Sequence, residues 1–246
     1  MKPTSVSLAL LIALQANSQT TPLQQIAITT GTARERVNKT FSIQAGKDSV
    51  KQGRYEESHG DANQFQVAGQ YQSNQKDGVW ERKYKGRVVS RKQYKKGERV
   101  GNWEFFNQET PDFQYDPANN AVFNLQEDTA AYYYYTTAGT WVKDQLDITP
   151  TPLMSKYEWL GWMSTKLRYP YEAIDKNIQG KVLVEMTIDE YGNVINYQVS
   201  APAHPLLDQE ALRLVKEFGF EFVPALKNGM KVRTKFTMPV VFKLQE

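Results

Sequence analysis

The pattern of apolar and polar residues differs between the two halves of the chain. Between about residues 50 and 107, aromatic residues alternate with polar ones in short segments, separated by glycine-containing breaks such as those at 85–86 and 95–98. Alternation with a period of two is typical of strands that bury one face. Glycine at the breaks supplies the positive φ of hairpin turns. This half therefore predicts an antiparallel β-meander whose buried face consists of aromatic rings.

From residue 156 onward, helical and strand periodicities follow one another. Trp159, Leu160, Met163 and Leu167 recur at helical spacing. The full order predicted is a helix over 156–167, a short helical segment over 171–177, strands over 180–188 and 194–200, a helix that begins at 207–208, and a strand over 231–244. We expect Asp208 to cap the second helix and Gly219 to end it. The prediction is an α+β fold, a three-stranded antiparallel sheet with two helices on one side.

The segment between these halves is harder to interpret. Residues 121–125, 130–137 and 140–142 have strand-like composition, and we expect these strands to complete the repeat sheet. Residues 148–152 contain two prolines and lack periodicity. The predicted domains are therefore a β-repeat domain over 19–147, a linker over 148–155 and an α+β domain over 156–246.

The first half contains an internal repeat. Three units share the pattern Gly-x-aromatic-Glu, and their glycines lie 25 and 23 residues apart: Gly53-Arg54-Tyr55-Glu56, Gly78-Val79-Trp80-Glu81 and Gly101-Asn102-Trp103-Glu104. Tyr71 and Tyr94 repeat the offset of 23 residues. A fixed period of this length is typical of repeat architectures.

These units resemble degenerate MORN-type repeats, written as G-x-W-x-x-Y with a glycine-rich turn. Gly78/Trp80/Tyr84 and Gly101/Trp103/Phe106 match that pattern in part, over about residues 50–107. The resemblance implies that the aromatic residues fill the core of a β-sheet, and we favour this role over ligand binding.

Charge is unevenly distributed. Residues 76–99 contain ten basic and three acidic residues, whereas residues 104–147 contain eight acidic residues and only Lys143 as a base. The basic stretch suits either an acidic partner or lipid phosphates, or a solvated surface that keeps exposed strands from aggregating. We favour the second interpretation, and the net charge of +3 is too small to indicate nucleic-acid binding.

The start of the chain resembles an export signal. Lys2 is followed by a short apolar run over 6–13, and residues 16–18 are small enough for cleavage before Gln19. The run is shorter than the roughly 20 residues that a membrane-spanning helix needs. We therefore expect a cleavable signal peptide over 1–18, a periplasmic location and no integral membrane segment in the mature chain. A buried N-terminal helix is the alternative.

The chain contains no cysteine. This excludes disulfides, a lipid-modified N-terminal cysteine, thiol nucleophiles and cysteine-ligated zinc. An exported protein without disulfides depends on its hydrophobic cores for stability.

A second resemblance rests on motifs in the last part of the chain. In order, they are Tyr169-Pro170 with Ala173, Gly180-Lys181-Val182, Asp189 with Gly192-Asn193-Val194, His204-Pro205 with Leu207-Asp208 and Ala211-Leu212, Phe222-Val223-Pro224-Ala225, and Asn228-Gly229 followed by Pro239-Val240-Val241-Phe242. Over about residues 156–246 this order is similar to the TonB C-terminal domain family.

The resemblance implies a periplasmic module that binds the short N-terminal segment of an outer-membrane receptor. In that mode an extended peptide adds to an exposed sheet edge through backbone hydrogen bonds. We expect the last strand to be that edge. The predicted binding segment is Lys231, Val232, Arg233, Thr234, Lys235 and Phe236, with its basic residues at the rim.

The chain also departs from the full transducer of that family. Such a protein has an uncleaved N-terminal membrane anchor and a long proline-rich spacer, whereas the start of this chain resembles a cleavable signal and its expected linker has two prolines. The resemblance therefore implies the binding domain and a link to TonB-dependent transport, whereas the anchor and spacer that energy transduction requires are not visible in the sequence.

The sequence gives no indication of an enzyme, and we expect no cofactor or metal. His204 lies near Asp208 and Glu210 but His59 falls in the other predicted domain, so neither histidine has the partners of a catalytic or metal site. Three hypotheses follow: a module that binds a peptide edge-on, an envelope scaffold that dimerises through the same edge, and an enzyme with an unrecognised carboxylate site. We favour the first, with an outer-membrane receptor or another envelope protein as partner.

Overall fold

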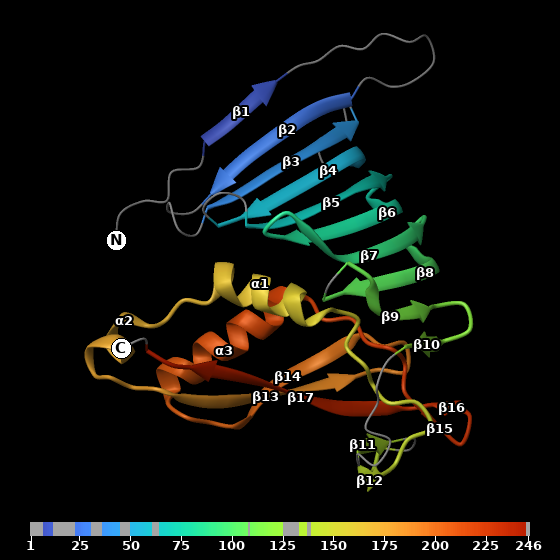
Figure 1. Cartoon of the computed structure of the whole chain (residues 1–246), viewed down its shortest axis with the longest axis vertical. Coiled ribbons are helices and arrows are strands. Elements are labelled where there is room, and N and C mark those ends of the chain that lie inside the picture. The colour runs from blue at the N-terminus through green and yellow to red at the C-terminus, as the bar shows by residue number, and fades with distance from the viewer. Residues whose placement is uncertain are drawn as a thin grey trace. The chain divides into compact units, whose positions relative to one another are not determined.

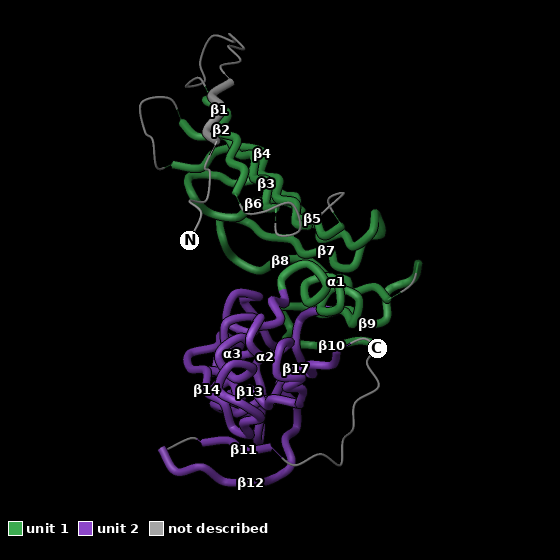
Figure 2. Tube along the Cα trace, turned by 90° about the vertical axis from the view of Figure 1, so that its left-hand side faces the viewer, with its two compact units in different colours: residues 1–125, 155–166 green, residues 126–154, 167–246 purple. Residues whose placement is uncertain are grey.

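The computed structural model describes residues 7–11, 23–30, 36–44, 50–60, 64–107, 109–124, 133–136 and 139–244. The chain forms two compact units (Figure 2). The repeat unit comprises Met1–Leu125 and Ser155–Lys166, and the C-terminal unit comprises Gln126–Met154 and Leu167–Glu246.

The repeat unit contains a ten-stranded antiparallel sheet in which each strand pairs with its neighbours in the sequence (Figure 1). Its strands are β1 (Ser7–Leu11), β2 (Leu23–Thr30), β3 (Val37–Gln44), β4 (Lys51–His59), β5 (Phe65–Gln72), β6 (Gln75–Tyr84), β7 (Arg87–Lys95), β8 (Glu98–Phe106), β9 (Pro111–Asp116) and β10 (Ala121–Phe123). The predicted β-meander is confirmed. The strand β1 falls inside the expected signal peptide, which stays a prediction.

The 23-residue repeat has a common geometry. The indole N–H of Trp80 donates to the carbonyl of Gln70 at 3.1 Å, and that of Trp103 donates to the carbonyl of Gln93 at 3.0 Å. Lys76 lies 5.1 Å from the Trp80 ring, and Arg99 lies 5.5 Å from the Trp103 ring. Both rings are buried. Each unit thus buries an indole, satisfies its N–H and places a cation over it.

The two units differ at Gly69. A Cβ atom at Gly69 would lie 2.3 Å from the Trp80 ring, so only glycine lets the indole lie on the backbone of β5. The position 23 residues later is Lys92, whose ammonium group lies 5.0 Å from the Trp103 ring. The Trp103 ring therefore lies beside the side chain of Lys92, whereas the Trp80 ring lies directly on the backbone of Gly69.

We expect Gly69→Ala to destabilise the repeat unit by about 1–3 kcal/mol, because a planar ring cannot move away from the added methyl without disturbing its neighbours. Urea unfolding measures this cost. In a Trp80→Leu background the same substitution should cost clearly less, since the flexible leucine can yield. An equal cost in both backgrounds would show that the indole is not the cause.

Helix α1 (Lys156–Lys166) belongs to the repeat unit, where it packs on β5, β6 and β7. The periodicity of the sequence predicts it within the C-terminal domain over 156–246. Its expected apolar stripe is also wrong, because the buried residues are Glu158, Gly161, Trp162 and Thr165, whereas Leu160 is exposed. A Cβ at Gly161 would lie 2.7 Å from the Tyr84 ring. The absence of a side chain at Gly161 lets α1 lie close to the sheet. A pattern of apolar residues does not identify a contact face that contains glycine.

Two polar contacts fix the start of α1. The backbone N–H of Glu158 donates to the hydroxyl of Ser155 at 3.1 Å, which caps the helix. The carboxylate of Glu158 is fully buried and pairs with Arg82 of β6. A buried charge of this kind needs its partner, so the pair holds α1 in register on the sheet.

A second buried polar cluster lies on β4. Glu57 accepts hydrogen bonds from Tyr55 and from His59, whose Nε2 lies 3.0 Å away, and it pairs with Lys39 at 3.0 Å. Burial opposes ionisation of Glu57, but the bonds from His59 and Tyr55 outweigh it and lower its pKa. Burial also lowers the pKa of His59, although Glu57 acts against this. Both groups therefore take up protons more readily in the unfolded chain.

The repeat unit should lose stability on acidification, first through His59. A histidine whose folded pKa is depressed contributes stability above its unfolded pKa of about 6.5, and this contribution declines as the pH falls toward the folded value. Glu57 adds a second loss below about pH 4.3. Urea midpoints at pH 7.5 and pH 5.5 measure the first step. The variant His59→Gln should flatten it, and an unchanged slope would contradict this assignment.

The C-terminal unit contains a five-stranded antiparallel sheet in the order β12-β11-β17-β13-β14 (Figure 1). Its elements are β11 (Tyr133–Thr136), β12 (Val142–Asp144), α2 (Tyr171–Asp175), β13 (Gly180–Ile188), β14 (Val194–Ala201), α3 (Pro205–Phe218) and β17 (Arg233–Phe242), with a separate ribbon of β15 (Leu226–Lys227) and β16 (Met230–Lys231). The expected three-stranded sheet is thus wrong in strand number.

Strands β11 and β12 account for the difference. Their strand-like composition predicts that they complete the repeat sheet, which is wrong: β11 pairs with β17 through Tyr135 opposite Thr234 and Thr136 opposite Arg233. Alternation of apolar and polar residues predicts that a segment is a strand, but it does not predict which other strand pairs with it. The expected linker over 148–155 is likewise bonded to this unit, since Val223 donates to the carbonyl of Thr151 at 2.9 Å and Leu153 donates to that of Glu221 at 2.8 Å.

Helix α3 packs on β13, β14 and β17 and closes the core of the C-terminal unit. The fully buried residues of this core include Val182, Val184, Met186, Ile188, Leu207, Ala211, Leu214 and Val215. The N-cap is His204, whose Nδ1 accepts from the N–H of Leu206 at 3.3 Å, and Pro205 follows in the first turn. Asp208, the expected cap, instead accepts from the N–H of Ala203 at 2.9 Å. Gly219 ends the helix with φ 69°.

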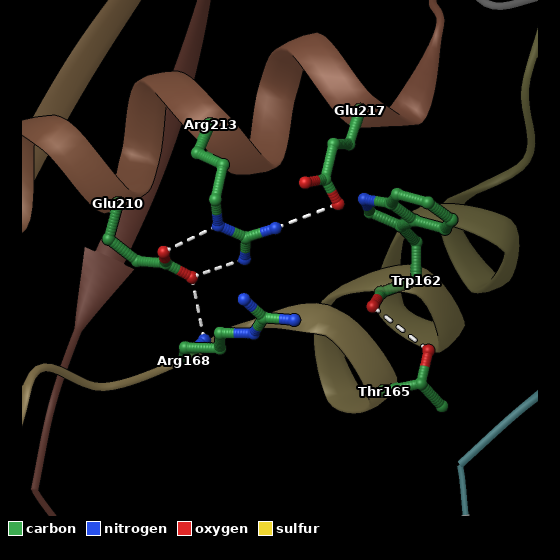
Figure 3. A network of polar contacts seen from close by, with 6 residues as sticks. All are labelled: Trp162, Thr165, Arg168, Glu210, Arg213 and Glu217. Atoms are coloured by element: carbon green, nitrogen blue, oxygen red, sulfur yellow. Dashed lines mark hydrogen bonds and ion pairs between the residues drawn. The ribbon is translucent and has the colours of Figure 1, made fainter. Parts of the chain in front are cut away.

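A network on α3 fixes the chain that precedes β13 (Figure 3). Arg213 donates two hydrogen bonds to Glu210, at 2.7 and 2.6 Å, and pairs with Glu217 at 2.7 Å. Glu210 also accepts from the backbone N–H of Arg168 at 2.6 Å. The helix α3 is thus bonded to the segment that precedes α2. Within the described part of the chain, no helix is long and apolar enough to span a membrane.

Candidate functional site

The two sides of β17 are paired to very different extents. On one side it pairs with β13 without interruption, from Gly180 opposite Phe242 to Ile188 opposite Thr234. On the other side β11 covers Arg233 and Thr234 alone. Within the described residues, the backbone from Lys235 to Phe242 therefore has one side without a paired strand. Unpaired N–H and C=O groups in a row are a template for strand addition.

Pro239 indicates which backbone groups point to that free side. Proline has no N–H, so within a strand it is tolerated where no ladder bond is needed. The residue opposite Pro239 is Leu183, and the carbonyl of Leu183 accepts from the hydroxyl of Ser200 on β14 at 3.3 Å. The backbone of Leu183 thus faces β14 and turns away from Pro239, so the groups of Pro239 point to the free side.

The other outward positions follow by alternation. Backbone groups of successive residues in an antiparallel strand point to opposite sides. With Pro239 outward and no bulge between β17 and β13, Lys235, Thr237 and Val241 also present their N–H and C=O groups to the free side. We call Lys235, Thr237, Pro239 and Val241 the free edge. It offers three N–H donors and four carbonyl acceptors to an added strand.

The side chains beside the free edge are mostly accessible. Thr237, Pro239 and Val241 are exposed, with Val241 at 54%. Lys235 pairs with Glu185 at 2.8 Å, and its ammonium group lies 4.9 Å from the Trp141 ring. The opposite side chains, such as Met238 and Val240, are buried in the core. A peptide bound here would meet a backbone that the core holds rigid.

The predicted binding segment coincides with the free edge only in part. Lys235 and Phe236 lie on the section of β17 that β11 leaves unpaired, whereas Arg233 and Thr234 pair with β11. Val232 is 1% exposed and donates to the carbonyl of Ala225 at 3.0 Å, so it is a core residue. Lys231 belongs to β16, where it pairs with Leu226.

Thr237, Pro239 and Val241 were not among the predicted site residues. The signal for them was the proline itself, because a proline inside a strand pattern points to an edge. The predicted segment was instead centred on the basic residues within 231–235, at the start of the strand.

The described residues contain no cluster of three or more histidine, aspartate or glutamate side chains that could hold a metal ion. His204 and Asp208, weighed above for catalysis, both bond to backbone at the start of α3. These bonds stabilise the first turn of α3.

Comparison with known proteins agrees with the resemblance found in the sequence. Residues 165–244 match the family model described as Gram-negative bacterial TonB protein C-terminal. The chain is 32% identical over 99 residues to Protein TonB of Vibrio cholerae serotype O1, and this match covers 40% of each chain. The chain thus spans about 40% of the length of this curated relative. No solved structure gives a significant match. The free edge lies within the region that matches the TonB C-terminal family.

Proposed function

We propose that the C-terminal unit is a TonB-type binding module that captures an extended peptide of an outer-membrane receptor or another envelope protein by strand addition. The observation that carries the proposal is the free edge: three outward N–H groups and four carbonyls on a strand whose other side is fully paired. The family match over 165–244 supports the same mode. The protein would act as a binder without catalysis, in the periplasm after removal of residues 1–18.

The repeat unit would serve this role as a rigid structural part. The aromatic residues Tyr55, Trp80, Tyr94 and Trp103 of its repeats are buried, and the ion pair of Glu158 with Arg82 joins α1 to β6.

The proposal is tested by binding of the full chain to peptides from the N-termini of outer-membrane receptors, labelled with a fluorophore and followed by fluorescence anisotropy. The full chain is needed because β11 lies outside the matched region and pairs with β17. We expect saturable binding to some of these peptides and none to scrambled versions. Failure of every receptor peptide at about millimolar concentration would contradict receptor binding.

An envelope scaffold that dimerises through the same edge is the second candidate. The same unpaired backbone that accepts a peptide can accept β17 of a second copy. Sedimentation velocity separates the two: a dimer that receptor peptides dissociate favours the scaffold, whereas a monomer that binds peptide favours capture.

A further inference from the structure

A cleft of about 390 Å³ lies in the repeat unit, between the β6–β7 hairpin, the end of β8 and the first turn of α1. It is distinct from the free edge, which belongs to the other unit. Its volume falls toward the lower end of the range of small-molecule sites.

The cleft has apolar surfaces and flat walls. Val89 and Phe106 line it and are 2% and 8% exposed, so they are anchored in the core. Tyr84 and Tyr157, which carry aromatic rings, also line it, one from the sheet and one from α1. Such rings favour a planar, apolar body that can stack or pack edge-on against them.

The walls are held in place without a ligand. Lys85 and Gly86 have φ of 49° and 78°, as in the two-residue turns that join rigid hairpins. The hydroxyl of Tyr84 lies 3.3 Å from that of Ser164, which donates to it from α1. The backbone N–H of Tyr157 donates to the side-chain oxygen of Asn107 at 3.3 Å. A preformed site of this kind loses little entropy when it binds.

The rim of the cleft is positive. Lys85 and Arg87 are exposed, and the residues lining the cleft include no carboxylate. The ammonium group of Lys85 lies 5.3 Å from the Tyr84 ring. A guanidinium group beside an aromatic wall matches a carboxylate carried by a flat group, because it can donate two parallel hydrogen bonds.

We propose that this cleft binds an anion that joins a carboxylate to a flat apolar group. Two sources have this chemistry: a free aromatic acid, and a peptide end in which an aromatic residue carries or precedes a carboxylate. The apolar body packs between Tyr84, Tyr157 and Phe106, and the carboxylate meets Arg87 and Lys85 at the rim. The proposal does not depend on peptide capture by β17.

The test uses NMR titration of the full chain with naphthalene-2-carboxylate, its neutral carboxamide and the dipeptide acetyl-Trp-Glu. We expect shifts in the amide signals of Lys85, Arg87, Val88 and Tyr157, with the carboxamide binding about tenfold or more weakly than the acid. Shifts with naphthoate alone support a free acid, and stronger binding of the dipeptide supports a peptide end.

A pair of variants separates this site from general attraction to a basic surface. Arg87→Gln should weaken the acid about tenfold and leave the carboxamide unchanged. Lys96→Gln is the control, because Lys96 is also an exposed basic residue at a hairpin of this sheet but does not line the cleft. Equal weakening by both variants, equal binding of acid and carboxamide, or no shift of the cleft residues at about millimolar probe would each overturn the proposal.

Discussion

Replacing Arg82 by methionine is expected to destabilise the repeat unit by about 3–5 kcal/mol, because it leaves the carboxylate of Glu158 buried without its partner. Glu158 is fully buried, and its Oε2 atom already lacks a hydrogen bond within the described residues. The remaining oxygen depends on Arg82. Urea unfolding followed by tryptophan fluorescence is a suitable measurement, since four of the five tryptophans belong to the repeat unit.

The double variant Arg82→Met, Glu158→Met is the control for this prediction. An apolar pair of similar volume removes the buried charge along with its partner, and such replacements are often neutral. We therefore expect the double variant to recover most of the loss. A single variant within about 0.5 kcal/mol of the natural protein would mean that the ion pair does not hold α1 on the sheet.

Replacing Thr237 by proline is expected to weaken peptide binding by about tenfold or more while the C-terminal unit stays folded. The N–H of Thr237 points to the free side of β17. A proline at this position therefore removes a donor that a bound peptide would use, and it removes no hydrogen bond between β17 and β13. Pro239 occupies the equivalent outward position two residues later and is tolerated there. Fluorescence anisotropy with a receptor peptide measures this loss of affinity. We expect it because one carbonyl of the peptide loses its hydrogen bond and the proline ring crowds the added strand.

Met238→Pro is the matched control. The N–H of Met238 faces β13, and its side chain is buried. This variant should lose a ladder bond, and the lost side-chain packing alone costs about 2–5 kcal/mol. If Thr237→Pro unfolded the unit and Met238→Pro did not, the alternation derived from Pro239 would be inverted.

The sequence predicted the elements of both units better than their partners. The alternation over residues 50–107 and the motifs after residue 165 predict β4–β8 and β13, β14 and α3 closely, because hairpin turns and helix ends are local. Helix α1 was placed in the wrong unit, since its contact with the sheet depends on Gly161 and on a buried Glu158 that pairs with Arg82, 76 residues earlier. A charged residue at a core position is not readable from apolar periodicity.

The sequence predicted that the last strand is the candidate edge, but of the residues on the free edge it indicated only Lys235. Whether a backbone group is free depends on which strands pair on each side, and β11 covers Arg233 and Thr234 from about 100 residues away in the sequence. The side to which Pro239 points also requires the register with Leu183. The cleft beside α1 was not predictable for the same reason, because Tyr157 and Tyr84 meet only after α1 packs on β6.

The most direct test of strand addition at β17 is amide hydrogen exchange of the full chain with and without a bound receptor peptide. The account predicts that the peptide slows exchange at Lys235, Thr237 and Val241, whose N–H groups point outward. Exchange at Phe236, Met238 and Val240 should change little, because β13 already pairs with them. Protection that appears at Arg233 and Lys231, or elsewhere with no change on the free edge, would contradict strand addition at this site.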